Sequence, residues 1–306
     1  MRKGISTTIL DTMTFTPLIG PIKLPELFGI DCNIYVKNEG FNLGGCIKIR
    51  SALTRIREAE RSGELQPGGT ILEASSGNQG IVLALIAAAK GYKCIIIMPS
   101  NMSKERACIM PLYGARLITS NEDGSEIKTT GEAKKYAEHL AVKNSNYFYM
   151  RQFEISPSDD SLSAAHEIVE QMGGIRLDGF VASFGTGYTL TSCARILKKS
   201  YPNLRVVAAQ PAKSPHIQQG IGVDFTPPIL DQNCYEGVIT VSDEDAVKTA
   251  KNLASKEGIL CGITSGTNVW AAMELAKDMP PGSNIVTILP DSGERYLSML
   301  CEEEAK

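Results

Sequence analysis

Three glycine-containing loops of this 306-residue chain carry side chains that could bind and activate a small molecule. The first loop, Asn42–Lys48, ends in a lysine that follows two glycines and opens an amphipathic pattern. Tight backbone surroundings desolvate a lysine ammonium and favour its neutral form, which is the form that attacks a carbonyl to give an imine. Taken alone, Lys48 also fits an ordinary lysine that points to water at the start of a helix.

The second loop, Ala74–Gly80, joins a strand-like run to a helix-like run. Its small residues expose backbone N–H groups at the positive end of a helix, where a carboxylate binds well. The amide of Asn78 adds a further donor. A plain strand-to-helix turn with a serine cap explains the same residues equally well.

The third loop, Phe184–Thr189, again has the order strand, glycine turn, helix. Backbone amides in such a turn bind phosphate, and the threonine hydroxyls add donors. A dinucleotide fingerprint would need a third glycine where Leu190 stands and an acidic residue near Gln210. The loop therefore favours a mononucleotide-like phosphate over a nicotinamide dinucleotide.

These loops belong to an ordered set of six motifs that resembles a known family. Lys37–Arg50 resembles K-x-E-x-x-N-x-G-G-S-x-K-D-R, Ser75–Gly80 resembles T-S-G-N-T-G, and Gly185–Thr189 resembles G-T-G-G-T. The other three segments are Ser214–Gly222, Gly258–Gly266 and Leu289–Ser298. From about Thr16 to Ser298 the sequence resembles the cysteine synthase and cystathionine β-synthase family, the second fold type of pyridoxal-phosphate enzymes.

The resemblance implies a role for each matched residue. Lys48 would form the imine with pyridoxal 5'-phosphate and move the substrate Cα proton, and Asn78 would bind the ring hydroxyl. Thr264 would face the pyridine nitrogen, with Ser265 as the neighbouring candidate. The phosphate would be bound by Gly185, Thr186, Gly187 and Thr189. The substrate carboxylate would be bound by Ser75, Ser76, Gln79 and the amide of Gln152.

The reaction implied by the family is β-replacement on a serine- or cysteine-type amino acid. An aminoacrylate forms by loss of the β-substituent and accepts a thiol or sulfide, while the cofactor acts as electron sink. If water releases the aminoacrylate instead, the enzyme is a lyase, such as a cysteine desulfhydrase or serine dehydratase. Two other classes are a nicotinamide-dependent dehydrogenase and a catalytically silent regulatory homologue; the intact Lys48, Asn78 and phosphate loop argue against the second.

Several positions depart from the family pattern. Cys46 replaces a serine, Ile49 an aspartate, Gln79 a threonine and Tyr188 a glycine. Residues 153–179 also lack the R-x-T-T-G-P motif common in cysteine synthases. Tyr188 could narrow the active site or pack outward. These departures leave the donor and nucleophile open.

Asp224, in G-I-G-V-D-F, stands where cysteine synthases usually have glycine and cystathionine β-synthases often have aspartate. Its carboxylate could act as a general base toward a bound hydroxyl, water or thiol. An acetyl leaving group needs no such help, so this residue favours serine or cysteine as donor over O-acetylserine. A loop aspartate that caps local backbone groups is the alternative.

The elements that must position these residues alternate between short apolar runs and helical patterns, which predicts an α/β fold. We expect two lobes, each an open, mostly parallel twisted sheet covered by helices, with the cofactor in the cleft between them. The smaller lobe is expected at 40–147 and the larger at 1–39 and 148–306. Predicted strands are 69–74, 93–98, 115–119, 146–150, 179–184, 204–210 and 284–289. Predicted helices are 51–62, 79–90, 104–113, 129–142, 162–172, 190–199, a helix capped by Ser242, 267–277 and 296–303.

Composition excludes several other classes. The net charge is -3 and basic residues form no stripe, so nucleic acid and anionic membrane surfaces are not expected partners. Eight scattered cysteines and three histidines form no zinc-ligand pattern, so no metal is expected. No apolar segment at the N-terminus or elsewhere resembles a signal peptide or membrane span, so we expect a cytoplasmic enzyme. The family resemblance implies a homodimer.

Overall fold

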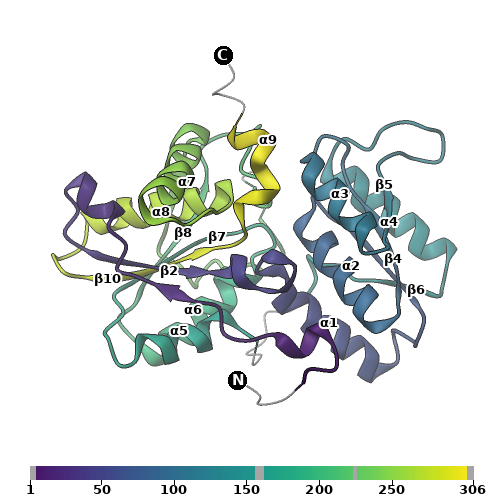
Figure 1. The fold of residues 1–306 in the computed structure, drawn as a ribbon, viewed down its shortest axis with the longest axis horizontal. Coiled ribbons are helices and arrows are strands. Elements are labelled where there is room, and N and C mark those ends of the chain that lie inside the picture. Colours follow the sequence, from purple (N-terminus) through teal and green to yellow (C-terminus); the bar gives the residue numbers. More distant parts are fainter. Residues whose placement is uncertain (1–4, 156–161, 223–225, 302–306) are drawn as a thin grey trace. The chain divides into compact units, whose positions relative to one another are not determined.

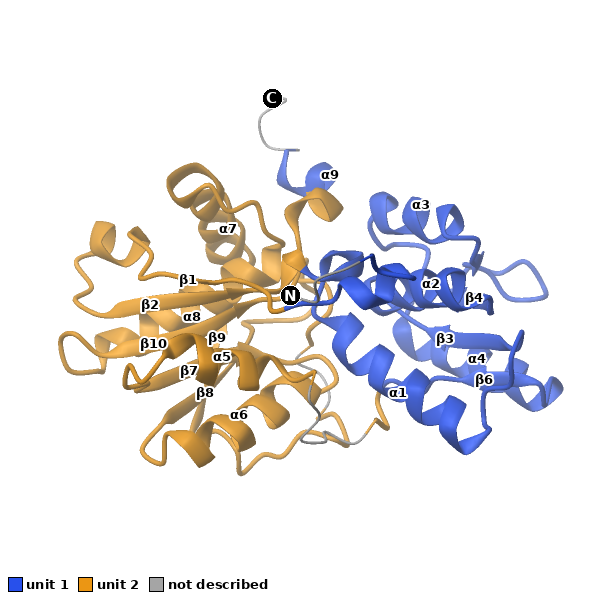
Figure 2. Cartoon of the chain, turned by 60° about the horizontal axis from the view of Figure 1, so that its bottom comes forward, with its two compact units in different colours: residues 1–14, 42–152, 297–305 blue, residues 15–41, 153–296, 306 orange. Residues whose placement is uncertain are grey.

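The computed structural model describes residues 5–155, 162–222 and 226–301, which divide into two compact units (Figure 2). Unit 1 comprises residues 1–14, 42–152 and 297–305, and unit 2 comprises residues 15–41, 153–296 and 306. Among the described residues, 5–14 and 297–301 belong to unit 1 together with 42–152. In the described part of the chain, no helix has both the length and the apolar character that a membrane span requires.

Unit 1 contains a parallel sheet of strand order β5-β4-β3-β6 (Figure 1). The strands are β3 Thr70–Ala74, β4 Lys93–Ile97, β5 Arg116–Ile118 and β6 Tyr147–Tyr149. The helices of unit 1 are α1 Lys48–Ser62, α2 Asn78–Lys90, α3 Lys104–Leu112, α4 Thr130–Lys143 and α9 Leu297–Leu300, with the short helices η1 Ile9–Thr12 and η4 Leu43–Gly45.

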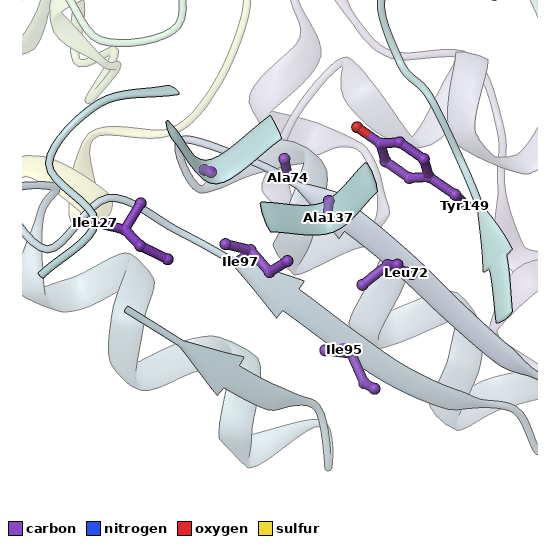
Figure 3. Packing of buried hydrophobic residues seen from close by; sticks show 8 residues of the cluster. Leu72, Ala74, Ile95, Ile97, Ile127, Ala137 and Tyr149 are labelled. Carbon is purple, nitrogen blue, oxygen red and sulfur yellow. The ribbon is translucent and has the colours of Figure 1, made fainter. Parts of the chain in front are cut away.

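The core of unit 1 follows from the apolar sequence of its central strands. All five residues of β3 are buried, as are the last four of β4, which is typical of parallel strands covered on both faces. On one face, Leu72 and Ile97 pack with Ala137 of α4 and with Tyr149 (Figure 3). Helix α2 ends where predicted, at Gly91, whose φ of 76° and N–H bond to Ala87 O form a left-handed cap.

Unit 2 contains a sheet of strand order β1-β2-β10-β7-β8-β9, in which β1 is antiparallel and the other pairs are parallel. Its strands are β1 Leu18–Ile19, β2 Asn33–Asn38, β7 Gly179–Ser183, β8 Arg205–Pro211, β9 Gly237–Val241 and β10 Asn284–Leu289. Its helices are α5 Ala164–Met172, α6 Tyr188–Ser200, α7 Asp243–Glu257 and α8 Ile263–Lys277, with η2 Leu24–Phe28, η3 Glu39–Phe41 and η5 Gly293–Tyr296. The α/β class and the seven predicted strands are therefore confirmed.

Strands β1, β2 and β9 were not predicted, and α8 begins earlier than predicted. The reasons are identifiable for α8 and β2. Helix α8 begins at Ile263, four residues before the predicted start, because Gly266 reads as a helix breaker in sequence. In the structure, α7 packs against α8 so closely at Gly266 that a Cβ there would overlap the carbonyl oxygen of Ala246 in α7. Strand β2 was missed because its Lys37 breaks the apolar run; that lysine is buried and bonds to Glu167 at 2.6 Å.

Candidate functional site

The lysine of the first loop is the first residue of α1 and is half-buried. The turn before it has two glycines with left-handed φ, 68° at Gly44 and 64° at Gly45. A Cβ at Gly44 would lie 3.0 Å from Cγ1 of Val82 in α2, so the turn packs directly on that helix. The buried Cys46 thiol donates to the carbonyl oxygen of Asn78 at 3.9 Å. Within unit 1, the turn preceding Lys48 is therefore attached to the start of α2.

The second loop is organised by Ser75, which is 1% exposed. Its hydroxyl oxygen accepts hydrogen bonds from the N–H groups of Gly77 and Gly80, both at 3.0 Å. Ser76 and Asn78 are half-buried. The N-terminal turn of α2 is thus folded around one serine side chain, and its positive end suits an anion.

Gln79 departs from the family threonine and is almost fully buried, at 3% exposed. Its Nε2 has no hydrogen-bond partner among the described residues. Burying an amide donor without a partner is costly, so such a donor is retained where a ligand can accept from it. This side chain fits the predicted role in carboxylate binding.

Gln152 is held at the end of β3 by a buried carboxylate that the sequence reasoning missed. Glu73 is 1% exposed and accepts from the N–H of Ala74 at 2.7 Å and from the N–H of Gln152 at 3.0 Å. The Gln152 Nε2 donates to the carbonyl oxygen of Ala74 at 2.8 Å, which leaves its second N–H to donate elsewhere. An acidic residue in the otherwise apolar run TILEA was the available signal.

In unit 2, the third loop joins β7 to α6 as predicted. Gly187 caps α6 with φ 88°, and a Cβ there would lie 2.8 Å from Cβ of Leu230. A Cβ at Gly185 would overlap the carbonyl oxygen of Gly220. Thr186 accepts from the N–H of Tyr188 at 3.4 Å, so its own O–H is available to donate. Tyr188 is the half-buried first residue of α6, followed by Thr189.

The two predicted hydroxyls near the ring nitrogen occupy the first turn of α8. Thr264 donates to the carbonyl oxygen of Gln219 at 3.1 Å, whereas Ser265 is fully buried and its Oγ has no hydrogen-bond partner among the described residues. The Cys261 thiol lies beside the Ser265 hydroxyl, but burial raises the pKa of this thiol to about 12, so it stays protonated and offers Ser265 only a weak S–H contact in place of a full hydrogen bond.

A buried pair that the sequence reasoning missed supports the same turn. The Tyr296 hydroxyl donates to Asp291 Oδ2 at 2.6 Å, and both residues are at most 1% exposed. A Cβ at Gly262, the residue that caps α8, would overlap Asp291 Oδ1 and lie 2.7 Å from Tyr296. The Asp291–Tyr296 pair therefore fixes the start of α8.

Each unit thus carries residues that fit pyridoxal phosphate. Unit 1 supplies the primary amine of Lys48 and the positive end of α2. Unit 2 supplies the glycine turn at Gly185 and Gly187, where neighbouring backbone leaves no room for a side chain, and the buried hydroxyl of Ser265, which has no hydrogen-bond partner among the described residues. Asp224 lies outside the described residues. Among the described residues, no three His, Cys, Asp or Glu side chains are grouped so that they could hold a metal ion.

Comparison with known proteins identifies the family of the chain. The family model described as "Pyridoxal-phosphate dependent enzyme" matches residues 9–291. A cysteine synthase of Staphylococcus aureus is 42% identical over 277 residues, covering 87% of this chain and 88% of the relative. The O-acetylserine dependent cystathionine β-synthase of Helicobacter pylori superposes with TM-score 0.87 at 33% identity, covering 96% of this chain and 98% of that one. A hydrogen sulfide-producing enzyme of Fusobacterium nucleatum gives TM-score 0.86 at 33% identity, covering 96% and 100%.

Proposed function

Because the chain belongs to the pyridoxal-phosphate-dependent enzyme family, we propose that it catalyses β-replacement on a serine- or cysteine-type amino acid with a sulfur nucleophile. The observation that carries this proposal is the attachment of the turn before Lys48 to the first residue of α2 through Cys46 and Asn78. This contact places the turn that precedes Lys48 beside the helix end that suits a carboxylate. An α-amino acid has a carboxylate for the end of α2 and an amino group that can replace the Lys48 amine on the cofactor.

The roles of the residues follow from their chemistry. When bound, the cofactor withdraws electrons from the substrate Cα. Lys48 would hold the cofactor covalently, and its amine, once the substrate amine has displaced it, would move the Cα proton; Asn78 would donate to the ring hydroxyl. Thr264, whose single O–H would then leave the carbonyl oxygen of Gln219, or Ser265 beside it, would donate to the ring nitrogen. The turn formed by Gly185, Thr186, Gly187 and Thr189 binds the phosphate.

The substrate carboxylate is bound at the start of α2. Ser75, Ser76 and Gln79 surround the positive end of this helix, and the free N–H of the Gln152 amide adds a donor. Holding the carboxylate and the Cα at fixed positions aligns the β-substituent for departure, which is the protein's main contribution beside proton transfer. Asp224 acts as the base that manages the proton of the departing or incoming group.

Donor trials test this function. Purified holoenzyme is incubated separately with serine, O-acetylserine, O-phosphoserine and cysteine, each with sulfide or homocysteine. We expect at least one donor to give cysteine with sulfide or cystathionine with homocysteine, formed only when the nucleophile is present, with serine or cysteine preferred. For the cysteine donor, the product to be measured is cystathionine formed with homocysteine, with release of hydrogen sulfide. If no donor gives a replacement product with either nucleophile, β-replacement is wrong.

The similarity to the hydrogen sulfide-producing enzyme favours β-elimination as the second candidate. The same donors without a nucleophile distinguish the two functions. An eliminating enzyme converts serine to pyruvate and ammonia, or cysteine to pyruvate, ammonia and hydrogen sulfide, at the same rate whether or not a thiol is present. A replacing enzyme gives little pyruvate in the presence of saturating thiol.

Assembly and location belong to the same proposal. The enzyme is a cytoplasmic homodimer, which is supported by the family resemblance and by the preference of soluble oligomers for two-fold symmetry. Light scattering at micromolar concentration should give twice the chain mass of 33.0 kDa. A mass of one chain would contradict the dimer, and recovery with the membrane fraction would contradict the location.

A further inference from the structure

The loop Ser75–Gly80 packs against a buried arginine of the neighbouring helix α3. Arg106 is 0% exposed and has the largest side chain among the fully buried residues. Its Nη1 donates to the carbonyl oxygen of Ser76 at 3.2 Å. A fully buried guanidinium thus lies directly behind the backbone of the loop at which the substrate carboxylate is proposed to bind.

The contact between α3 and this loop is close at two points. Gly77 has φ 137°, and a Cβ there would overlap Cδ of Arg106 and lie 3.2 Å from its Cβ and Cγ. One helical turn later, the Sδ of Met110 would lie 2.6 Å from a Cβ at Gly80. Arg106 and Met110 are on the same face of α3 because they are four residues apart. Both glycines of the loop are therefore required by the face that α3 presents to it.

Burying an arginine is costly, because the guanidinium remains charged in proteins and loses its hydration. Its hydrogen bond to the Ser76 carbonyl holds the peptide that leads into α2 in place, with the N–H of the same peptide, that of Gly77, donating to Ser75 Oγ, and its positive charge adds to the positive end of that helix. Both effects favour an anion on the exposed side of the loop. Arg106 itself acts only through the loop, since its side chain is covered.

We propose that Arg106 is a positioning residue that sets the conformation and the anion affinity of the loop Ser75–Gly80, and through it the discrimination for a substrate with a free α-carboxylate. This inference rests on the proposed function, in which the loop binds that carboxylate. It assigns to a residue outside the binding loop the selectivity for substrates whose α-carboxylate is negatively charged.

The test compares Arg106→Met and Arg106→Lys with Arg57→Met, a matched control at an exposed arginine of α1. Two ligands are compared: L-serine, and L-serinamide, in which a neutral carboxamide replaces the carboxylate. Binding of each ligand is measured from the change in the visible spectrum of each holoenzyme. Arg106→Met should weaken L-serine binding about tenfold and change L-serinamide binding much less, because only L-serine carries a negatively charged α-carboxylate. Arg106→Lys should recover most of the difference because it keeps the charge, and Arg57→Met should match the wild type.

A second measurement needs no cofactor. Hydrogen exchange of the cofactor-free proteins should be faster at the amides of Gly77 and Gly80 in Arg106→Met than in Arg57→Met, because the loop loses its support. Equal weakening of both ligands, or unchanged binding and exchange, would overturn the role of Arg106 alone. A wild-type enzyme that takes up the cofactor but responds to neither ligand would overturn the proposed function and this inference with it.

Discussion

The Cys46 thiol donates to the carbonyl oxygen of Asn78 at 3.9 Å and thereby joins the turn before Lys48 to the first residue of α2. The thiol of Cys46 is a weaker donor than the hydroxyl of the family serine. Through this contact, the turn before Lys48 and Asn78, which the family resemblance assigns to one cofactor, lie next to each other in unit 1.

The glycine turn before α6 should be essential for cofactor binding. Gly187→Asp places a carboxylate where backbone amides are proposed to meet phosphate, and like charges repel. Gly187→Asn is the matched control, because it has the same shape and the same crowding against Leu230, whose Cβ would lie 2.8 Å from a Cβ at this position, but no charge. Fluorescence titration should show weaker cofactor binding in Gly187→Asp than in Gly187→Asn. Equal cofactor affinity in the two variants would place the phosphate elsewhere.

The two hydroxyls of the first turn of α8 can be distinguished by stability. Thr264→Val removes a hydrogen bond to Gln219 and should lower the unfolding free energy of the cofactor-free protein by about 1 kcal/mol. Ser265→Ala removes a hydroxyl without a partner among the described residues, so its cofactor-free stability should not fall. We expect Thr264→Val alone to reduce the additional stability that the cofactor provides. If only Ser265→Ala reduces it, Ser265 is the ring-nitrogen partner.

The buried thiols should make the protein sensitive to alkali. Burial raises the pKa of Cys94 and of Cys261 to about 12, so both thiols keep their protons in the folded state when the unfolded chain loses them. Their stabilising contribution is complete below the unfolded pKa and falls as the pH rises toward 12. Thermal unfolding between pH 8 and about 10.5 should show decreasing stability, and less decrease in the Cys94→Ala, Cys261→Ala double variant. Parallel pH profiles would contradict this account.

Asp224 should affect chemistry rather than folding if it acts as a general base. Asp224→Asn preserves the shape and removes the charge, so turnover should fall by about 10²–10⁴ with donors that need proton transfer. O-Acetylserine, whose leaving group departs without a proton, should be affected least. Turnover equal to that of the wild type with every accepted donor would leave Asp224 as a structural loop residue.

The parts of the fold that sequence could predict are those with local signals. Continuous apolar runs identified β3 and β4, and the Ser242 cap of α7 was correct because its bond to the N–H of Asp245 spans only three residues. Strand β2 was missed because burial of Lys37 depends on Glu167, 130 residues away. A hydrophobic pattern read over neighbouring residues cannot reveal such a long-range ion pair, so a buried lysine looks like an exposed one.

The candidate site shows the same division. The three loops were found because glycine, serine and threonine spacing is local. The support of these loops was not, since Glu73 binds Gln152 across 79 residues and Arg106 binds Ser76 across 30. The burial of Asp291 with Tyr296 was also invisible in sequence, because both residues are polar and follow a strand. Sequence therefore predicted the loops proposed to bind a ligand but not the buried residues that support them.

The most direct test of the account is the covalent attachment of the cofactor to Lys48. The holoenzyme is reduced with borohydride, digested and analysed by mass spectrometry, together with Lys48→Ala and the exposed-lysine control Lys134→Ala. The account predicts that the wild type and Lys134→Ala carry the cofactor mass on the peptide containing Lys48. It also predicts that Lys48→Ala folds normally but loses the modified peptide, the visible absorption band and turnover. A Lys48→Ala enzyme with normal turnover, or a cofactor attached to another lysine, would contradict it.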